Sequence, residues 1–227
     1  MAWTDRHGGV STGRYSTANL STRSADDPAA VRENRARLAT TLGLGDPDRW
    51  WWLHQVHGAA VLDADEPPPA AVPPADAAVT TTAGRPLAVL TADCAPVVLA
   101  SDDAVAVVHA GWVGLLTGVV AAAVDRLRAR GRGPVRAAIG PCIHPDRYAF
   151  GADDLGRVVA AYGPTVAART ADGGPALDLP AAVRAALAGV GVTDVHDVGV
   201  CTAASADHFS YRRDGETGRQ AVVAVLG

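Results

Sequence analysis

The sequence predicts a mixed α/β or α+β fold, in which mixed β-sheets are flanked by helices in a single compact domain over residues 1–227. Short continuous apolar runs, typical of buried strands, alternate with longer segments that carry helix-capping residues. The runs between Leu87 and His109 are spaced as in hairpins, which argues against a strictly parallel sheet. A chain of 227 residues, 48% of them hydrophobic, is long enough to bury one large core.

The first predicted helix follows a clear start signal. Asp27 suits the N-cap, Pro28 suits the first helical position, and Gly43 closes the segment. Further along, the proline-rich stretch from Asp63 to Ala77 predicts an irregular surface connection within the same domain.

The predicted strands are short apolar runs separated by polar turns, although periodicity alone does not distinguish them from buried helix. They cover residues 86–92, 96–101, 104–110, 135–140, 194–200 and 220–226. Three further helices are expected over residues 114–131, 152–163 and 179–191. Gly131 ends the first of these, and Asp178 is the expected cap of the last.

Composition and charge exclude several classes of partner. The net charge of −4 comes from mixed signs without a polybasic patch, so nucleic acid is not an expected partner. No apolar run is long enough for a membrane span, and the first residues do not look like a secretory signal, so a cytoplasmic protein is expected. The chain contains no lysine, so a phosphate group would have to be held by arginine, backbone N–H groups or a metal.

Four reactive side chains lie where predicted buried strands end: Cys94, His109, Cys142 and Cys201. Strand ends hold side chains rigidly at a crevice. Three widely spaced cysteines do not make a disulfide framework, which leaves the thiols for chemistry or metal. The spacing of His57, Cys94 and His109 matches no local metal motif, but two imidazoles and a thiolate suit zinc and leave a fourth position open.

Several ordered segments carry a resemblance that covers nearly the whole chain. They are RHGGVSTGRYSTANLS, DDPAAVRENRARLA, QVHGAAV, LAVLTADCAPVVLA, AVVHAGWVG, AAIGPCIHPDRYAFG and CTAASADHFSYRRDGETGRQA. In these motifs the chain resembles the laccase-domain family, whose members are described as polyphenol oxidase, as purine nucleoside phosphorylase with adenosine deaminase activity, and as peptidoglycan editing factor. The resemblance implies a catalytic zinc site formed by His57, Cys94 and His109.

The resemblance also implies a reaction and a set of substrate-binding residues. The expected chemistry is phosphorolysis of adenosine or inosine to base and ribose 1-phosphate, deamination of adenosine, or both. Zinc lowers the pKa of bound water to roughly 7 and polarises substrate oxygens, and arginine binds phosphate through two N–H groups. A nucleoside and phosphate are the expected partners of a monomer or homodimer. The residues expected to bind substrate or to support the site are Arg6, Asn19, Gln55, Asp93, Cys142, Thr202 and either Arg212 or Arg213.

One position departs from the family pattern. The family has HAGWRG where this chain has HAGWVG, with Val113 in place of the arginine. An arginine at the start of a helix beside a metal ligand can hold an anion, and valine cannot. The metal ligands are intact, but the expectation of phosphate binding is weakened. Backbone N–H groups in the turn before Gly114 remain available to an anion.

Three alternatives stay open. In a cysteine-type amide hydrolase acting on mis-built cell-wall precursors, Cys94 would be the nucleophile, activated by His109 or His57. In a polyphenol oxidase, copper would occupy the same three-ligand pocket. The seven histidines contain no His-x-His pair and cannot build a multicopper array, so only weak phenol oxidation is expected. A non-enzymatic binding module is favoured only by Val113.

Overall fold

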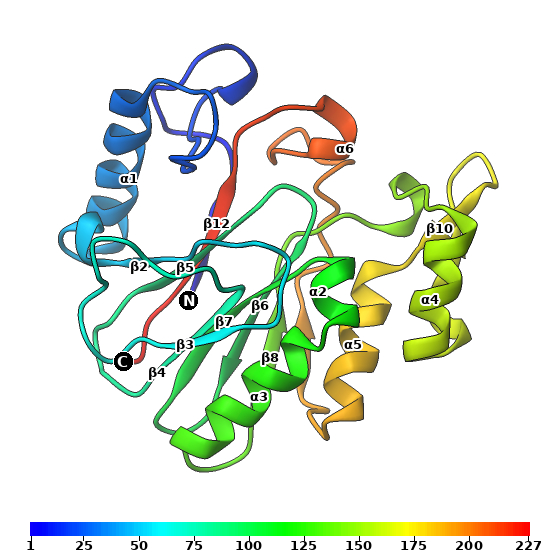
Figure 1. The fold of residues 1–227 in the computed structure, drawn as a ribbon. Helices are drawn as coiled ribbons and strands as arrows, with labels where there is room; N and C mark the ends of the chain where they lie inside the picture. Colours follow the sequence, from blue (N-terminus) through cyan, green and yellow to red (C-terminus); the bar gives the residue numbers. More distant parts are fainter.

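The computed structural model describes residues 1–227, and its elements stack in four layers (Figure 1). Helix α1 (Pro28–Leu42) covers a four-stranded sheet, which packs against a six-stranded sheet. The far face of the six-stranded sheet is covered by α3 (Val119–Arg130) and α5 (Leu179–Gly189). The predicted fold of mixed sheets flanked by helices is therefore confirmed.

The six-stranded sheet is mixed. Its order is β11 (Val195–Asp197), β8 (Arg136–Ile139), β6 (Ala95–Ala100), β7 (Val105–Ala110), β4 (Ala77–Thr80) and β3 (Val61–Asp63). Strands β6 and β7 form an antiparallel hairpin in which Pro96 lies opposite His109. The two outer strands, β11 and β3, run parallel to their neighbours.

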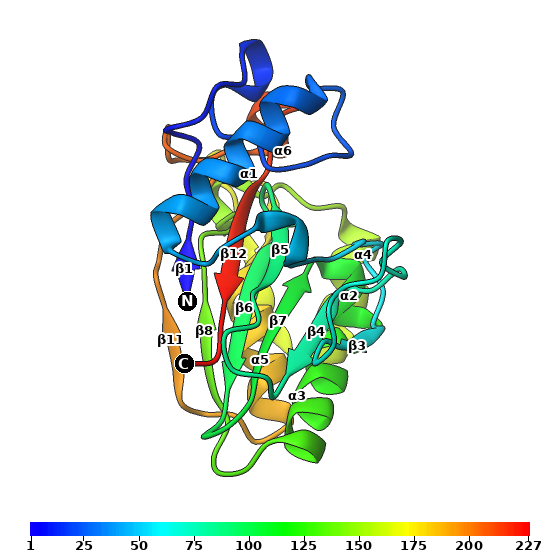
Figure 2. The ribbon, with the colours of Figure 1, turned by 90° about the vertical axis from the view of Figure 1, so that its left-hand side faces the viewer.

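The four-stranded sheet joins the two ends of the chain. Its order is β1 (Ala2–Trp3), β12 (Gln220–Ala224), β5 (Leu87–Thr91) and β2 (Trp51–Trp52). Strand β12 is antiparallel to both β1 and β5, and β2 is parallel to β5. In the view turned by 90°, α1 lies in front of this sheet (Figure 2).

The predicted hairpin spacing between Leu87 and His109 is right for β6 and β7 and wrong for β5. Strand β5 pairs with β12 in the other sheet, so the chain crosses between the sheets through residues 92–94. Local spacing did not indicate this because the partner of β5 comes from the far end of the chain. The crossing brings Cys94 to the region between the sheets.

The helix caps form as predicted. The Asp27 side chain accepts a hydrogen bond from the Ala29 N–H at the start of α1, and Gly43 ends this helix with φ of 65°. Asp178 caps α5 by accepting from the Ala181 N–H. Helix α4 (Ala152–Tyr162) also matches its prediction, whereas α6 (Tyr211–Asp214) was not expected.

The prediction of a single helix over residues 114–131 is wrong. The segment forms α2 (Trp112–Leu116) and then α3, with Gly118 between them at φ of 88°. Glycine adopts this left-handed conformation at little cost, and it interrupts the helical path. The break separates α3 from α2, which begins three residues after His109.

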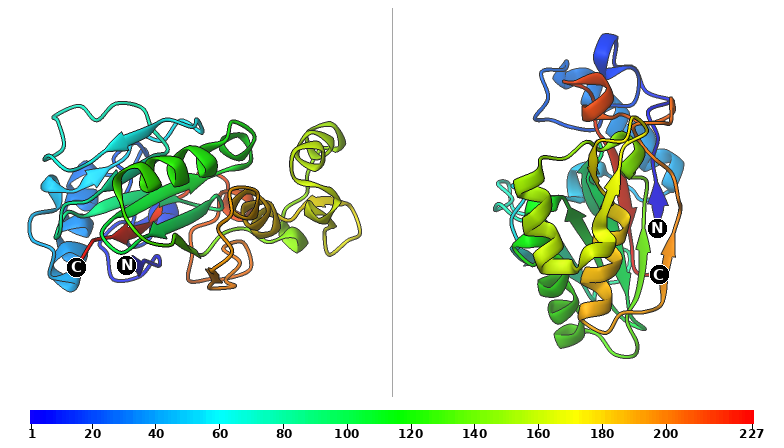
Figure 3. Two further views of the ribbon diagram at one scale, coloured as in Figure 1. Left: turned by 90° about the horizontal axis from the view of Figure 1, so that it is seen from below. Right: turned by 90° about the vertical axis from the view of Figure 1, so that its right-hand side faces the viewer.

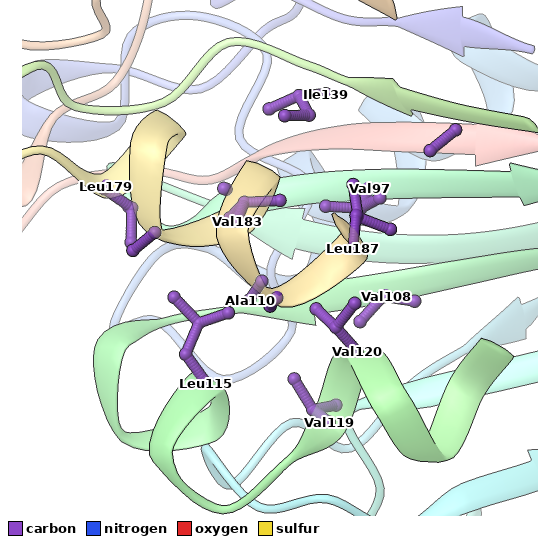
Figure 4. Close-up of a cluster of buried hydrophobic side chains, with 14 of the residues drawn as sticks. Val97, Val108, Ala110, Leu115, Val119, Val120, Ile139, Leu179, Val183 and Leu187 are labelled. Atoms are coloured by element: carbon purple, nitrogen blue, oxygen red, sulfur yellow. The ribbon is translucent and has the colours of Figure 1, made fainter. Parts of the chain in front are cut away.

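Strand alternation divides the core between the two faces of the six-stranded sheet. On β6, Val97 and Leu99 pack against the helices, whereas Val98 packs against the four-stranded sheet. Figure 4 shows the helix-side cluster, in which apolar side chains of the sheet meet those of α2, α3 and α5. Its labelled members are Val97, Val108, Ala110, Leu115, Val119, Val120, Ile139, Leu179, Val183 and Leu187.

At the edge of the molecule beyond α5, α4 lies beside the hairpin of β9 (Ala167–Arg169) and β10 (Pro175–Leu177) (Figure 3).

None of the helices is long and apolar enough to span a bilayer.

Candidate metal centre

His109 lies near the end of β7, on the strand face that meets the second sheet. Val105 and Val107 on that face are buried between the sheets, and the two-residue period of a strand extends this face to His109. His109 is 4% exposed, and its Nδ1 lies 2.8 Å from Oδ1 of Asp76. An ionised carboxylate only accepts hydrogen bonds, so Nδ1 donates to Asp76 and Nε2 is the ring atom that could bind a metal.

His57 is held by the same carboxylate. The backbone N–H groups of Val56, His57 and Gly58 donate to the Asp76 side chain at 3.0, 2.9 and 2.7 Å. These bonds hold His57 at φ of 60°, a left-handed conformation that residues other than glycine rarely adopt. Asp76 itself is fully buried directly before β4. One buried carboxylate therefore orients the His109 imidazole and holds the backbone that carries the His57 imidazole.

Cys94 lies on the crossing between β5 and β6, after Asp93, whose φ is 101°. The Asp93 carboxylate accepts hydrogen bonds from the Thr202 hydroxyl and from the backbone N–H of Arg212, both at 2.7 Å. These bonds connect the crossing to two segments near the C-terminus. In this position the Sγ of Cys94 lies 3.7 Å from Nε2 of His57.

The ligand atoms of His57, Cys94 and His109 all lie within 4.8 Å of one another. Gly111 makes room for this cluster, because a Cβ there would lie 2.8 Å from His57 Cδ2 and 3.0 Å from Cys94 Sγ. Two imidazoles and a thiolate are preferred ligands of zinc, and one ion can bridge such a spacing with small side-chain adjustments. The three side chains thus form a group that could hold a metal ion.

The negative charge of the Cys94 thiolate and the positive charge of the His109 ring stabilise each other. Burial raises the pKa of the Cys94 thiol, but the positive charge of His109 and hydrogen bonds from His109 and His57 outweigh it and lower the pKa to about 6. Burial lowers the pKa of His109, whereas the Cys94 thiolate and Asp76 raise it to about 9. A thiolate is the form of cysteine that binds metals.

The cluster opens into a cavity of about 900 Å³ between the ends of the two sheets. Aromatic side chains make up part of its wall: Trp52, Trp112, Tyr148 and Tyr211. Arginines line it as well: Arg23, Arg35, Arg212 and Arg219. Aromatic faces suit a planar base, guanidinium groups suit an anion, and the volume suits a small organic ligand.

Three of the residues predicted to contact substrate line this cavity: Gln55, Asp93 and Arg212. The Gln55 amide exchanges two hydrogen bonds with the Leu90 backbone, at 2.6 and 2.8 Å, which fixes the end of β5. Arg212 donates to the Ala149 carbonyl oxygen at 2.7 Å and stacks on Tyr148 with 4.5 Å from Cζ to the ring centroid.

The other predicted residues lie outside the cavity wall. Arg6 donates to the Ser16 carbonyl oxygen at 2.8 Å and lies over the Phe209 ring. Arg213 donates to the carbonyl oxygens of three residues, Thr202, Ser205 and His208. Cys142 is 1% exposed and forms a β-bridge with Cys201, and Thr202 supports Asp93 as described. Asn19 is fully buried, and its Oδ1 accepts from the backbone N–H of Arg219 at 2.9 Å.

Val113 is 37% exposed on α2 and is not part of the cavity wall, although its neighbour Trp112 is. The wall instead contains three arginines that were not predicted, Arg23, Arg35 and Arg219.

The cluster also depends on Asp76, which was not predicted. Asp76 lies within the stretch interpreted as an irregular connection. In the sequence, Asp76 is marked only by the apolar run that follows it, which forms β4. Side chains at strand ends are held rigidly enough to serve a site.

Comparison with known proteins assigns the whole chain to one family model. The family described as multi-copper polyphenol oxidoreductase laccase matches residues 1–227. A purine nucleoside phosphorylase of Streptomyces griseus is 47% identical over 227 residues, which cover 97% of this chain and 92% of the relative. A purine nucleoside phosphorylase of Deinococcus radiodurans is 43% identical over 232 residues, covering 100% and 88%.

Solved structures share the fold. The crystal structure of YlmD from Geobacillus stearothermophilus has a TM-score of 0.89 at 30% identity, covering 99% of this chain and 91% of that one. The Neisseria meningitidis protein NMB0706 has a TM-score of 0.88 at 36% identity, covering 99% and 93%.

Proposed function

The chain belongs to the multi-copper polyphenol oxidoreductase laccase family, and from this premise we propose that it is a metal-dependent purine nucleoside phosphorylase. The observation that carries the proposal is that the His57–Cys94–His109 cluster opens into a cavity lined by aromatic side chains and arginines. The names of the relatives from Streptomyces griseus and Deinococcus radiodurans support the reaction class.

Zinc is the proposed metal, because two imidazoles and one thiolate match its ligand preference and leave a position open. When bound, it supplies Lewis acidity that polarises a substrate oxygen. The chain's own residues prepare the site for it. Asp76 fixes the His109 imidazole and the backbone of His57, and Gly111 leaves the space that the Cys94 sulfur and the His57 ring occupy.

In the proposed phosphorolysis of adenosine or inosine, a phosphate oxygen forms a bond to C1′ of the ribose while the bond from C1′ to purine N9 breaks. The electron pair leaves on the purine, which takes up the proton that dihydrogen phosphate gives up. The products are the free base and ribose 1-phosphate. The protein's part is to stack the base on aromatic walls such as Trp112 and Tyr148 and to hold the phosphate with guanidinium groups.

Deamination of adenosine at the same cluster is the second candidate. His57 is exposed and Cys94 half-buried, so water from the cavity can reach the cluster. This reaction consumes water and releases ammonia and inosine, and it is independent of phosphate.

The amide hydrolase alternative rests on the 3.7 Å distance between Cys94 Sγ and His57 Nε2, which suits a thiol and its base. Polyphenol oxidation by a multicopper array is not supported, because the chain contains a single cluster of three potential ligands. Copper in that cluster remains an alternative to zinc.

One assay separates these functions. Metal-loaded protein is incubated with adenosine or inosine, with and without phosphate, and the products are separated by chromatography. Free base and ribose 1-phosphate, formed only with phosphate, support phosphorolysis; inosine formed from adenosine without phosphate supports deamination. If neither forms and the protein instead releases an amino acid from a muramyl precursor, the proposal is wrong and the amide hydrolase alternative is supported.

A further inference from the structure

None of the four cavity arginines forms an ion pair with a carboxylate, and two of them, Arg35 of α1 and Arg219 just before β12, are also anchored to the same segment of backbone. The ion pairs of the molecule involve none of the four. Arg35 uses only Nε, which donates to the Leu20 carbonyl oxygen at 2.9 Å. Arg219 uses only Nη1, which donates to the carbonyl oxygens of Thr217 and Gly218 at 2.8 and 2.9 Å. Each guanidinium group therefore keeps unused N–H groups.

The two arginines are anchored to the same short piece of backbone. The Leu20 carbonyl oxygen accepts from Arg35, and the Leu20 N–H donates to the carbonyl oxygen of Arg219 at 3.1 Å. The neighbouring Asn19 side chain accepts from the Arg219 N–H at 2.9 Å. These bonds anchor the Arg35 side chain and the Arg219 backbone to adjacent residues, and both arginines line the cavity.

Arg35 is supported by an aromatic ring, and both guanidinium groups are half-buried. The Cζ of Arg35 lies 3.9 Å from the centroid of the Trp52 ring, so the guanidinium plane is supported on one side by indole. Burial lowers the pKa of Arg35 to about 10, and it also lowers the pKa of Arg219, on which the charges of Cys94 and Asp93 act in the opposite direction. A half-buried cation that forms no ion pair is costly, and a bound anion would offset that cost against the repulsion from the Cys94 and Asp93 charges near Arg219.

We propose that Arg35 and Arg219 form an anion subsite that binds a phosphate group within the cavity shared with the metal cluster. The planar forks of arginine bind phosphate oxygens through paired N–H groups. The identification of the anion as phosphate rests on the proposed function. Of the arginines expected to hold phosphate, Arg6 and Arg213 are engaged outside the cavity wall and Arg212 lines it, whereas Val113 carries no charge. The subsite therefore adds two arginines that were not expected.

The test measures phosphate binding directly. Metal-loaded protein is titrated calorimetrically with inorganic phosphate, with ribose 1-phosphate and, as a salt control, with chloride. Arg35→Gln and Arg219→Gln are each expected to weaken phosphate-group binding by about tenfold or more, as expected for the loss of charge-assisted bonds. Arg37→Gln is the matched control, because Arg37 lies on the same helix but pairs with the exposed Glu33; it should bind as the wild type does.

The results distinguish this subsite from the proposed reaction. Binding of inorganic phosphate or of ribose 1-phosphate that depends on both arginines supports the subsite, and the tighter of the two identifies its ligand, even if no nucleoside is turned over. Phosphorolysis with an unchanged KM for phosphate in both variants overturns the subsite and leaves the reaction standing. If Arg35→Gln does not fold, Arg35→Lys and Arg219→Gln decide the matter. The subsite is also overturned if the wild-type protein binds neither inorganic phosphate nor ribose 1-phosphate.

Discussion

The Asp76 carboxylate lies 2.8 Å from Nδ1 of His109, and the same oxygen accepts the backbone N–H of His57 at 2.9 Å. A residue outside the cavity wall thus orients the ring of one candidate metal ligand, His109, and holds the backbone of another, His57. Burial raises the pKa of Asp76, but hydrogen bonds from His109 and from the Gly58 and Val56 N–H groups outweigh it and keep the pKa below its usual value. Asp76 is therefore ionised and acts as an acceptor.

Asp76→Asn should weaken metal binding while Cys94, His57 and His109 are all retained. The amide cannot accept all the bonds of the carboxylate, and loss of such a supporting group typically costs roughly 10- to 100-fold in metal affinity. A competitive chelator titration measures this. Asp63→Asn, which removes a surface ion pair with Arg126, is the control. Equal zinc affinity of the Asp76 variant and the wild type would contradict the positioning role.

Gly111→Ala should disturb the cluster without disturbing the fold. Gly111 has φ of −80°, which alanine adopts freely, so the effect is purely steric. The new Cβ would displace His57 and Cys94, and metal affinity should fall by roughly tenfold or more. Gly156→Ala on α4, where no atom lies within 4 Å of the added Cβ, is the matched control. Full metal content in the Gly111 variant at limiting zinc would show that the cluster is not confined by this residue.

Much of the fold and part of the site could be predicted from local signals. The caps at Asp27 and Asp178 and the buried runs of β6 and β7 depend on neighbours in the sequence, and each formed as expected. The three candidate metal ligands came from the family resemblance, because their spacing matches no local motif. The structure brings them within 4.8 Å of one another.

The remaining features depend on long-range packing. Asp76 is recognisable only once β4 and β7 pair and bring its backbone carbonyl oxygen within 2.7 Å of the His109 N–H. Arg35 lies on the first helix and Arg219 near the last strand, so their common anchor at Leu20 has no local pattern. Similarly, the helix-like pattern of apolar residues continues through Gly118 in the sequence. Only the left-handed backbone conformation of Gly118 separates α2 from α3.

Val113→Arg restores the family residue beside the cavity wall. The position is 37% exposed, so the charge remains solvated, although a cation in the first turn of a helix opposes the helix dipole. We expect about a threefold lower KM for phosphate and a stability loss of at most about 1 kcal/mol. Val113→Gln, which adds polarity without charge, should change neither KM nor stability measurably. An arginine variant with an unchanged or higher KM for phosphate would mean that this position does not act on the anion.

Removal of metal should expose the Cys94 thiolate and destabilise the protein. A ligand bound only to the folded state stabilises it by about 2.7 kcal/mol at 100 times its dissociation constant, so chelation should lower Tm. In the metal-free protein, iodoacetamide should alkylate Cys94 rapidly at pH 7.5, whereas Cys142 stays protected by burial. Peptide mass spectrometry locates the modification. Identical Cys94 labelling with and without bound zinc would argue against the sulfur as a ligand.

The most direct test of the central claim, that His57, Cys94 and His109 share one ion, is the metal content of two cysteine variants. Wild-type protein and Cys201→Ala, purified after zinc loading and dialysis, should each hold one zinc ion per chain by atomic emission. Cys94→Ala should hold none and should show no nucleoside turnover. A folded Cys94→Ala protein that retains stoichiometric zinc would contradict the account.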